Sequence, residues 1–475
     1  MSAHYEGQRV LVAGAGVAGA ASAEVLLGLG AVVTVLDRAE SETLVRLKAA
    51  GAQVVLGDEP PADLLGTLDA VVLSPGFAPH TPVARSAARA GLPVYSEPEL
   101  AWRLRGPGSP SWLAVTGTNG KTTTTTMLAA ILRAAGRRTA ALGNIGEPLV
   151  HAALSAEYDV LAVELSSFQL HWSSTLAPRA GALLNLADDH LEWHGDFEHY
   201  ATAKLAVWRA AGTADGVAVG NLDDPAVARR LAAQPGRRVG VTLGVPGPGQ
   251  LGVVDGALVD RAFDADGTPL AAGDAHAAAG VELGSVSDVR PPGTHNVSNA
   301  LHAAALARAY GVAPYAIRAG LAGYEPQPHR NAFVATVAGV SYVDDSKATN
   351  PHAALASLTA YPRLVWVAGG QLKGVDVGDL VATVANRLAG AVLLGVDRGQ
   401  IADALRRHAP HVPVVEVART DDGAMTEVVR AAAGLARPGD TVLLAPAAAS
   451  KDMFHGYDHR GEAFAAAVRA LPAQG

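Results

Sequence analysis

Short runs rich in valine and leucine alternate with alanine-rich stretches of helical length along almost the whole chain of 475 residues. Strands followed by helices in this way pair in parallel and need helices on the faces of their sheets. The first such series begins at 9–37, a second opens at 112–115, and a third lies beyond 326–328. The alternation therefore predicts an α/β protein with more than one parallel sheet.

Linker-like proline and glycine runs indicate where the chain divides. The length suggests about three domains, since one hydrophobic core rarely serves so many residues. A Gly-Pro-Gly-Ser-Pro run at 106–110 and a Pro-Gln-Pro run at 326–328 give the boundaries. We predict domains at 1–108, 109–325 and 326–475.

The alternation breaks between about 233 and 293. Within this stretch, 251–260 centres on Asp255-Gly256, a pair typical of a tight hairpin turn. We expect a peripheral extension of the middle domain there.

Composition excludes several classes of protein. The formal net charge of −8 and the pI near 6.0 argue against a nucleic-acid partner. Cysteine is absent, which rules out disulfides and thiolate metal sites. No apolar run reaches the roughly 18 residues of a membrane span, and the run at 9–13 is too short for a signal peptide. We expect a cytoplasmic protein with neither a membrane nor a nucleic-acid partner.

The run Thr-Gly-Thr-Asn-Gly-Lys-Thr-Thr at 116–123 lies between a predicted strand and a predicted helix. Its glycines let backbone N–H groups and the helix N-terminus face phosphate oxygens. Lys121 adds a charge for the β- and γ-phosphates, and the Thr122 hydroxyl can bind Mg²⁺. A simple glycine turn would not need this Lys-Thr pair. The run departs from the full Walker pattern, because Val115 stands five residues before Gly120, where glycine is usual.

Two candidate metal ligands follow later strands of the same series. Glu164 ends the predicted strand 159–163, and His190 comes soon after the strand 181–186. Ligands gather at the carboxyl ends of parallel strands, where an acid can hold Mg²⁺ on a nucleotide. Taken alone, Glu164 is more typical of a capping acid, His190 of a structural histidine, and Lys204 of a surface lysine on a helix.

A dinucleotide-binding fingerprint, Gly-Ala-Gly-Val-Ala-Gly, stands at 14–19, and Asp37 follows 18 residues after its last glycine. A NAD-dependent oxidoreductase is therefore the alternative from another class. The phosphate loop at 117–122 favours a sugar nucleotide instead, because a dehydrogenase has no use for an ATP site. A P-loop motor or switch protein is a third possibility, which predicts ATP hydrolysis without small substrates.

Four motifs together resemble the Mur ligases, a family of ATP-dependent amide ligases with folylpolyglutamate synthetase relatives. They are Gly-Thr-Asn-Gly-Lys-Thr at 117–122, Glu-Leu-Ser-Ser-Phe-Gln-Leu at 164–170, Asp-His-Leu at 189–191 and Asp-Asp-Ser-Lys-Ala-Thr-Asn at 344–350. The last is similar to the D-glutamate-adding members rather than to those that add L-alanine or a diamino acid.

The resemblance covers essentially the whole chain and implies three α/β domains. These are an N-terminal Rossmann-like UDP-binding domain, a central P-loop ATPase-like domain and a C-terminal Rossmann-like domain that binds the amino acid. It implies that D-glutamate is added to UDP-N-acetylmuramoyl-L-alanine through an acyl phosphate, in cytoplasmic peptidoglycan precursor synthesis. We expect a monomer.

The resemblance also implies ATP and two Mg²⁺ ions as cofactors. By it, Thr122 and Glu164 bind one Mg²⁺, while His190 and a carbamoylated Lys204 bind the second. A carbamate suits that place, because it is an anionic oxygen ligand where an ammonium would be repelled. The implied catalytic residues are Lys121, Glu164, His190 and Lys204.

Substrate contacts are carried over residue by residue. The implied ATP contacts are Gly117, Thr118, Asn119, Gly120, Lys121, Thr122, Thr123, Asn296, Asn299, Arg330 and Asp345. The implied contacts to the UDP-linked substrate are Gly16, Val17, Ala18, Gly19, Asp37, Arg38, Ser74, Pro75, Gly76, Asn144 and His190. The implied D-glutamate contacts are Thr349, Lys373, Ser450 and Tyr457, and Lys347 is implied to line the active site.

Some of these positions have plainer interpretations or depart from the family. Asn296 is also typical of a helix N-cap, and Lys373 of an exposed loop. Ala332 replaces a usual glutamate two residues after Arg330, and Tyr457 replaces a usual phenylalanine.

Overall fold

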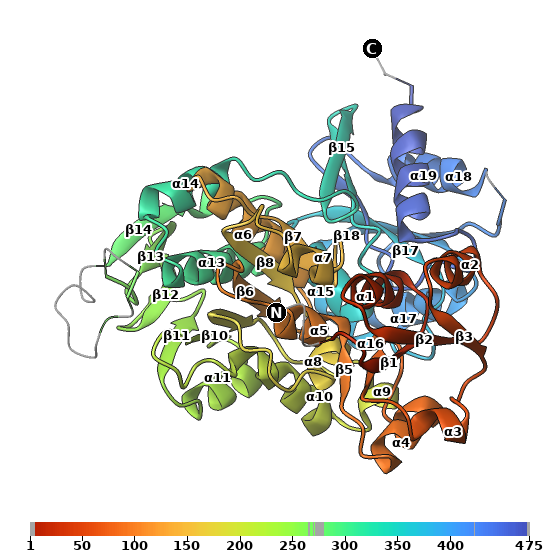
Figure 1. Ribbon diagram of the computed structural model, residues 1–475. Coiled ribbons are helices and arrows are strands. Elements are labelled where there is room, and N and C mark those ends of the chain that lie inside the picture. The colour runs from red at the N-terminus through yellow and green to blue at the C-terminus, as the bar shows by residue number, and fades with distance from the viewer. Residues whose placement is uncertain (1–4, 265–266, 269, 271–279, 422, 473–475) are drawn as a thin grey trace. The chain divides into compact units, whose positions relative to one another are not determined.

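The computed structural model describes residues 5–264, 267, 268, 270, 280–421 and 423–472 of the chain (Figure 1). The chain forms two compact units: Met1–Asp288 with Ser298–Tyr324, and Val289–Val297 with Glu325–Gly475. No helix in the described part of the chain is both long and apolar enough to cross a membrane.

The first unit begins with a five-stranded parallel sheet in the order β3-β2-β1-β4-β5. Its strands are β1 (Arg9–Ala13), β2 (Val32–Asp37), β3 (Gln53–Leu56), β4 (Ala70–Leu73) and β5 (Val94–Ser96). Its helices are α1 (Val17–Gly28), α2 (Glu42–Ala49), α3 (Ala62–Leu65), α4 (Pro82–Arg89) and α5 (Glu97–Arg103).

Both faces of this sheet are covered. Val10 and Val12 of β1 pack in a core that also contains residues of α1, α2 and α5. Leu11 and Ala13 face the other way and pack with residues of α4. Strands buried on both faces read as continuous apolar runs, which is why β1 carries almost no polar residue.

A nine-stranded sheet follows in the order β14-β13-β12-β11-β10-β9-β6-β8-β7. Its strands are β6 (Ser111–Thr116), β7 (Ala141–Gly143), β8 (Val160–Glu164), β9 (Ala180–Leu183), β10 (Val217–Asn221), β11 (Arg237–Val241), β12 (Gln250–Val254), β13 (Ala257–Asp260) and β14 (Val281–Ser285). Its helical segments are α6 (Lys121–Ala134), α7 (Leu149–Ala153), α8 (Ser167–His171), α9 (Leu191–His194), α10 (Phe197–Leu205), η2 (Ala206–Trp208), α11 (Pro225–Ala232), η3 (Val286–Asp288), α13 (Thr294–Ala309) and α14 (Pro314–Ala322).

The strands that carry the motifs lie side by side at the centre of this sheet. Strand β6 pairs in parallel with β8 on one side and with β9 on the other. At the far edge, β12 and β13 form an antiparallel hairpin with its turn at Asp255-Gly256, which confirms the predicted turn. Residues 265, 266, 269 and 271–279 of the predicted extension lie outside the described residues.

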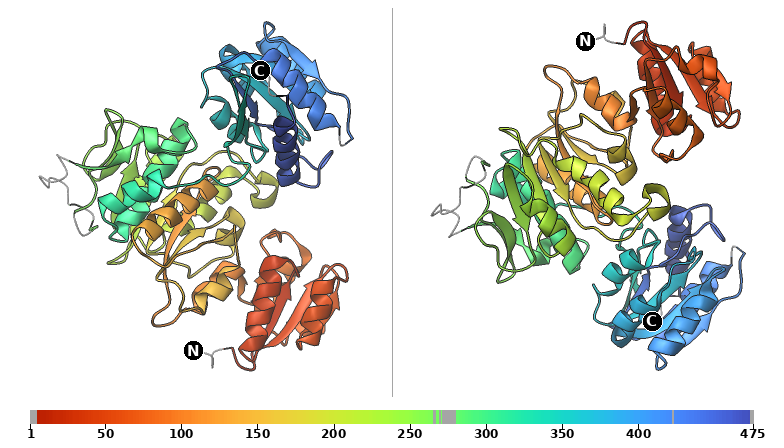
Figure 2. Two further views of the ribbon diagram at one scale, coloured as in Figure 1. Left: turned by 90° about the horizontal axis from the view of Figure 1, so that it is seen from above. Right: turned by 90° about the horizontal axis from the view of Figure 1, so that it is seen from below.

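The second unit, coloured from teal to blue over 325–475 in Figure 2, holds a six-stranded sheet. Its strand order is β15-β16-β20-β17-β18-β19, and all neighbours are parallel except the antiparallel β15–β16 pair. Its strands are β15 (Ala332–Val337), β16 (Val340–Asp344), β17 (Leu364–Gly369), β18 (Leu388–Leu394), β19 (Val414–Glu416) and β20 (Thr441–Leu444). Its helical segments are α15 (Pro351–Leu358), α16 (Gly378–Val384), η4 (Ala385–Arg387), α17 (Arg398–His408), α18 (Ala424–Leu435) and α19 (Tyr457–Arg469).

Helices cover both faces of this sheet as well. Trp366 packs in a core with residues of α15, α16 and α17, while Val365 and Val367 pack with residues of α18 and α19. The predicted α/β class with parallel-rich sheets is therefore confirmed. The boundaries at 108/109 and 325/326 stay predictions.

Candidate active site

The phosphate loop joins the buried strand β6 to helix α6. Gly117 and Gly120 have φ of 153° and 82°, which side chains rarely allow. A Cβ on Gly120 would lie 2.4 Å from Asn299 Oδ1. Lys121 opens the helix, and its Nζ donates to the carbonyls of Gly117 (3.0 Å) and Thr118 (2.8 Å). The loop thus ends at a lysine that is the first residue of helix α6.

Two residues that the sequence did not single out fix the shape of this loop. Asn185, just after β9, accepts from the Asn119 N–H (2.8 Å) and donates to its carbonyl (3.1 Å). The Tyr200 hydroxyl lies 2.8 Å from Thr118 Oγ1. The only available signals were that Asn185 ends a strand and that Tyr200 stands one helical turn before Lys204.

Glu164 stands at the end of β8 and is 2% exposed. Its Oε2 accepts from the Thr122 hydroxyl (2.7 Å), and its Oε1 accepts from Asn144 Nδ2 (2.8 Å). The structure therefore brings together three of the predicted site residues from three separate segments.

His190 has a left-handed backbone with φ of 55°. Its ring lies 4.7 Å from the ring of Phe168, centroid to centroid, and its nitrogens lie 3.6 Å and 3.8 Å from carboxylate oxygens of Asp189 and Glu192. Among the described residues, His190 makes no hydrogen bond or ion pair with Glu164 or Lys204.

Lys204 is not the surface lysine that its position on α10 favours, because it is only 2% exposed. Its Nζ donates to the Gly117 carbonyl (2.8 Å) and lies 4.6 Å from the centre of the Tyr200 ring. Burial, and secondarily the charge of Lys121, hold the pKa of Lys204 well below its usual value. The uncharged form of the Lys204 amine is therefore much more populated here than it would be on the surface.

The oxygens of Thr122 and Glu164 suit a hard cation such as Mg²⁺, which also takes phosphate and water oxygens. The described residues contain no group of three or more His, Cys, Asp or Glu side chains that could hold a metal without such partners. A metal at this place would therefore depend on the nucleotide for part of its coordination.

The Gly-rich run at 14–19 forms the turn after β1 and the first residues of α1, as the fingerprint predicts. Gly19 packs α1 against the turn, because a Cβ there would lie 1.8 Å from the Gly14 carbonyl oxygen. Asp37 accepts from the Ala15 N–H (2.7 Å) and the Arg38 N–H (2.6 Å). Ser74 donates to the Gly14 carbonyl (3.2 Å), which joins the Ser-Pro-Gly motif to the Gly-rich turn.

In the second unit, Asp345 follows β16 and is 8% exposed. It accepts from the Asn331 N–H (3.1 Å) and from the Ser357 hydroxyl. Burial raises its pKa to about 7. In the segment Val289–Val297 of the same unit, Asn296 Nδ2 donates to the Pro292 carbonyl (3.3 Å).

The turn after Asp345 is held by a buried arginine that the sequence did not mark as functional. The Arg460 guanidinium donates to the hydroxyl oxygen and to the carbonyl oxygen of Ser346 (both 2.9 Å). It also donates to the Ala448 carbonyl (3.1 Å). Lys347 places its Nζ 3.6 Å from the centre of the Tyr457 ring. The structure thus brings Lys347 and Tyr457 together.

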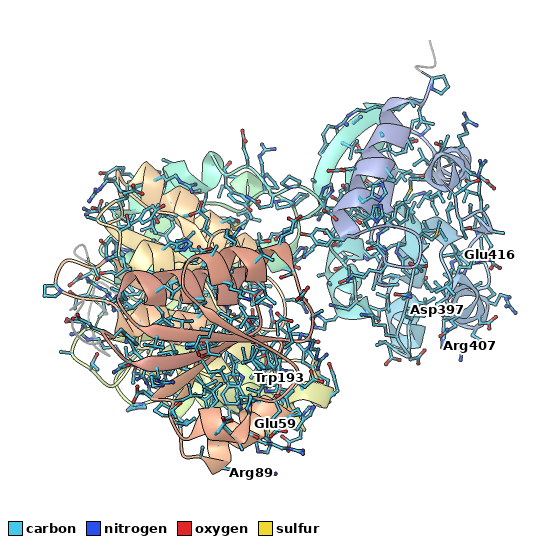
Figure 3. The ribbon with its side chains drawn as sticks, turned by 45° about the vertical axis from the view of Figure 1, so that its right-hand side comes forward. Glu59, Arg89, Trp193, Asp397, Arg407 and Glu416 are labelled. Carbon is cyan, nitrogen blue, oxygen red and sulfur yellow. The ribbon has the colours of Figure 1, made fainter. Side chains whose placement is uncertain are left out.

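Lys373 is exposed and has a left-handed backbone with φ of 53°. Asp397, labelled in Figure 3, accepts from the N–H of the preceding Leu372 (2.8 Å) and anchors this turn. Ser450 is buried, and the N–H groups of Met453 and Phe454 donate to its carbonyl.

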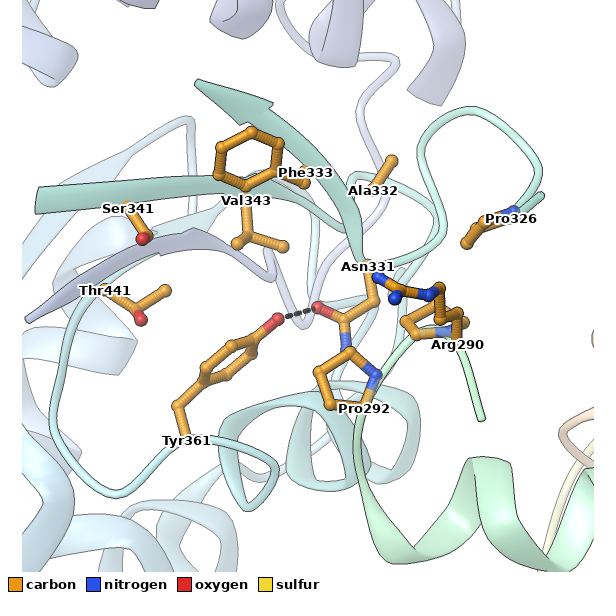
Figure 4. A pocket seen from close by; sticks show the side chains of 11 residues that line it. Arg290, Pro292, Pro326, Asn331, Ala332, Phe333, Ser341, Val343, Tyr361 and Thr441 are labelled. Carbon is orange, nitrogen blue, oxygen red and sulfur yellow. Dashed lines mark hydrogen bonds between the residues drawn. The ribbon is translucent and has the colours of Figure 1, made fainter. Parts of the chain in front are cut away.

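A pocket of about 420 Å³ lies entirely within the second unit (Figure 4). Phe333, Val343 and the Tyr361 ring give it apolar walls, and Asn331 adds a polar side chain. Asn331 is the residue whose N–H binds Asp345, so the pocket adjoins a predicted nucleotide contact.

The fold and these motifs define a multidomain α/β protein with a phosphate loop at the carboxyl end of a central parallel sheet. Family models match as the MurD-like N-terminal domain over 8–96, the Mur ligase middle domain over 115–307 and the Mur ligase glutamate ligase domain over 329–448. The chain belongs to the Mur ligase family.

Curated relatives agree along the full length of the chain. The UDP-N-acetylmuramoylalanine--D-glutamate ligase of Thermobifida fusca is 56% identical, covering 98% of this chain and 99% of its own. That of Streptomyces avermitilis is 53% identical, covering 99% and 100%.

Solved structures of other Mur ligases share the fold at low identity. MurF from Acinetobacter baumannii aligns with a TM-score of 0.57 at 19% identity, covering 99% of this chain and 92% of that one. MurC from Thermotoga maritima aligns with a TM-score of 0.55 at 17% identity, covering 98% and 99%.

Proposed function

We infer that this chain is the ATP-dependent ligase that joins D-glutamate to UDP-N-acetylmuramoyl-L-alanine in peptidoglycan precursor synthesis. Relatives that are 53–56% identical over nearly the whole chain carry that name. The structural observation that supports it best is the contact of Thr122 with Glu164 beside a lysine-bearing phosphate loop. We further propose that the enzyme is monomeric and cytoplasmic.

The proposed reaction begins with transfer of the ATP γ-phosphoryl group to the carboxylate of the muramoyl-alanine. Lys121 and the loop N–H groups offset the negative charge that spreads over the transferred group. The D-glutamate amine then attacks the acyl phosphate, and the resulting tetrahedral intermediate expels phosphate to leave the amide. Positioning and electrostatics supply most of the acceleration, since no side chain needs to bond covalently to substrate.

We propose that Thr122 and Glu164 hold one Mg²⁺ against the nucleotide, and that His190 and Lys204 hold a second. Bound Mg²⁺ supplies charge neutralisation at the phosphoryl oxygens. Asn144 fixes Glu164 from the side opposite Thr122, so the carboxylate is oriented before any ligand arrives.

Lys204 is proposed to act as a carbamate. Carbamate forms when an uncharged amine attacks CO₂ and loses a proton, so the lowered pKa of Lys204 favours it. The product turns a buried cation into an anionic oxygen ligand, which suits a site for divalent cations.

Substrate contacts in both units are proposed as the resemblance implies them. The Gly-rich turn, with Asp37 and the Ser74 motif, takes the UDP end of the acceptor. Asp345 takes the nucleotide ribose. Beyond the resemblance, we propose that the pocket that adjoins Asp345 takes the base. Thr349, Lys373, Ser450 and Tyr457 take D-glutamate, with Lys373 paired to one of its carboxylates.

The experiment is a phosphate-release assay with ATP, UDP-N-acetylmuramoyl-L-alanine and a panel of amino acids. We expect release with D-glutamate alone. Equal release with L-glutamate or without any amino acid would refute the assignment. A thermal-shift comparison of NAD(H) with the UDP sugar separates the oxidoreductase alternative, because only the UDP sugar should protect the enzyme.

A further inference from the structure

The wall of the second unit's pocket contains a buried amide with an unmet donor. Asn331 is 6% exposed, and its Oδ1 accepts from the Tyr361 hydroxyl at 2.6 Å. Figure 4 shows these two side chains pointing toward one another. Asn331 Nδ2 is buried as well, and it has no hydrogen-bond partner among the residues described.

Such a donor is unusual, because nearly all buried polar groups in folded proteins are hydrogen-bonded. A buried donor without a partner destabilises the fold, because it loses its hydrogen bonds to water and gains none in the protein. Asn331 is also fixed from its backbone, where its N–H donates to Asp345 at 3.1 Å. Asn331 is therefore fixed through its backbone N–H and its side-chain oxygen, while its side-chain Nδ2 donates no hydrogen bond among the described residues.

The local backbone is strained in a way typical of functional sites. His329 and Asn331 both have positive φ, 61° and 53°. Asparagine adopts this left-handed conformation more readily than most residues. Glycine would adopt it at least as well, so the turn alone does not explain why asparagine stands at 331. The conformation sends the Asn331 N–H to Asp345 and its side chain to the pocket wall.

The apolar side chains of the pocket suit the faces of a heteroaromatic ring. Pro292, Pro326, Phe333, Val343 and the ring of Tyr361 line it with apolar surface. A purine presents apolar faces to such walls and ring nitrogens that accept hydrogen bonds at its edge. Arg290 also lines the pocket, and none of the described lining residues is acidic, so the lining disfavours a cation and can take a neutral base.

We propose that Asn331 Nδ2 donates a hydrogen bond to a ring nitrogen of the ATP base, and that Tyr361 orients the amide for this contact. Asn331 is then a specificity-determining residue for the nucleotide. The proposal rests on the proposed function, because that function supplies ATP as the ligand.

The test pairs changes in the ligand with changes in the protein. Dissociation constants are measured by calorimetry for ATP and its 1-deaza, 3-deaza and 7-deaza analogues, each lacking one acceptor nitrogen. For the unaltered enzyme we expect one analogue to bind about tenfold more weakly than ATP, and the other two to bind as ATP does. Equal binding of all four nucleotides would overturn the proposal without any variant.

Asn331→Gly keeps the left-handed backbone and removes the amide. This variant should bind ATP about tenfold more weakly and should no longer distinguish ATP from the sensitive analogue. If it still distinguishes them, Asn331 is not the donor. Tyr361→Phe should weaken ATP binding less and keep part of the discrimination, whereas a purely structural role would leave the ratio between nucleotides unchanged.

Asn386→Gly is the matched control, since Asn386 is exposed in the same unit. It should bind all four nucleotides as the unaltered enzyme does. Because binding is measured without turnover, failure of the proposed function would appear separately, as an enzyme that binds ATP but forms no amide.

Discussion

Lys121 and Lys204 both donate to the carbonyl of Gly117, yet their environments suit different tasks. Lys121 is half-buried in the first turn of α6, beside the loop that is proposed to bind phosphate. Lys204 is fully enclosed, which disfavours the charged amine. Residue type alone could not separate the two, because only the fold determines which lysine is buried.

Replacing Lys121 by alanine should reduce turnover by at least a hundredfold, because nothing else in the loop supplies a positive charge to the transferred phosphoryl group. ADP release under saturating substrates measures this. Arg133→Ala, which removes an exposed cation from the same helix, is the control and should leave the rate unchanged. A Lys121 variant with normal turnover would show that the loop does not act on ATP.

Lys204→Ala should cripple the enzyme to a similar degree, since it removes the proposed carbamate. Thr202→Ala, an exposed position on the same helix, should be fully active. Mass spectrometry of the native protein tests the modification itself by the added mass of CO₂. Full activity of the Lys204 variant would eliminate the carbamate.

Asp345 gives a pH-dependent contribution to stability. Burial raises its pKa from 3.8 to about 7. A carboxyl with a raised pKa in the fold stabilises it below the unfolded pKa, and this contribution is lost as the pH rises through the folded pKa. Between about pH 4 and 7 the thermal midpoint should therefore decline less in Asp345→Asn than in the unaltered protein. Calorimetric scans across that range would contradict the assignment if both proteins declined equally.

At the scale of elements, the sequence predicted the phosphate loop, the strand that ends at Glu164, a strand before His190, and the turn at Asp255-Gly256. The strand before His190 is shorter than the predicted 181–186, because β9 spans Ala180–Leu183. Each depends on local chemistry: glycine at positive φ, apolar runs, or turn residues. The sequence could not predict Asn185 bracing Asn119, Tyr200 bracing Thr118, or Asn331 binding Asp345. Those contacts join segments that are separated in the chain, and no short sequence motif predicts them.

Helix α1 is positioned by a glycine whose role is packing. Gly19→Ala should lower the thermal midpoint by several degrees, because its Cβ would overlap the Gly14 carbonyl oxygen and push the helix away. Gly28→Ala in the same helix meets nothing within 4 Å, and should stabilise the protein slightly through helix propensity. Thermal unfolding of both variants measures the difference, and equal midpoints would refute the packing role.

At the scale of the molecule, the predicted series of α/β domains corresponds to three sheets in chain order. Within the first unit, two sheets are joined by a buried acid that the sequence did not reveal. Glu99 of α5 is fully buried, and it accepts from the Thr175 hydroxyl (2.6 Å) and the Leu176 N–H (2.9 Å) beyond α8. A glutamate in a short helix is predicted to be a surface residue unless its partners, here in the loop between α8 and β9, are known.

The central claim is that ATP activates the acceptor carboxylate before the amide forms. The direct measurement uses UDP-N-acetylmuramoyl-L-alanine with ¹⁸O in its terminal carboxylate, together with ATP and D-glutamate, and follows the label by mass spectrometry. The account predicts one ¹⁸O atom in each phosphate released and one ADP for each amide formed. Phosphate without ¹⁸O, released whether or not amide appears, would contradict it, because water rather than the carboxylate would then have attacked ATP.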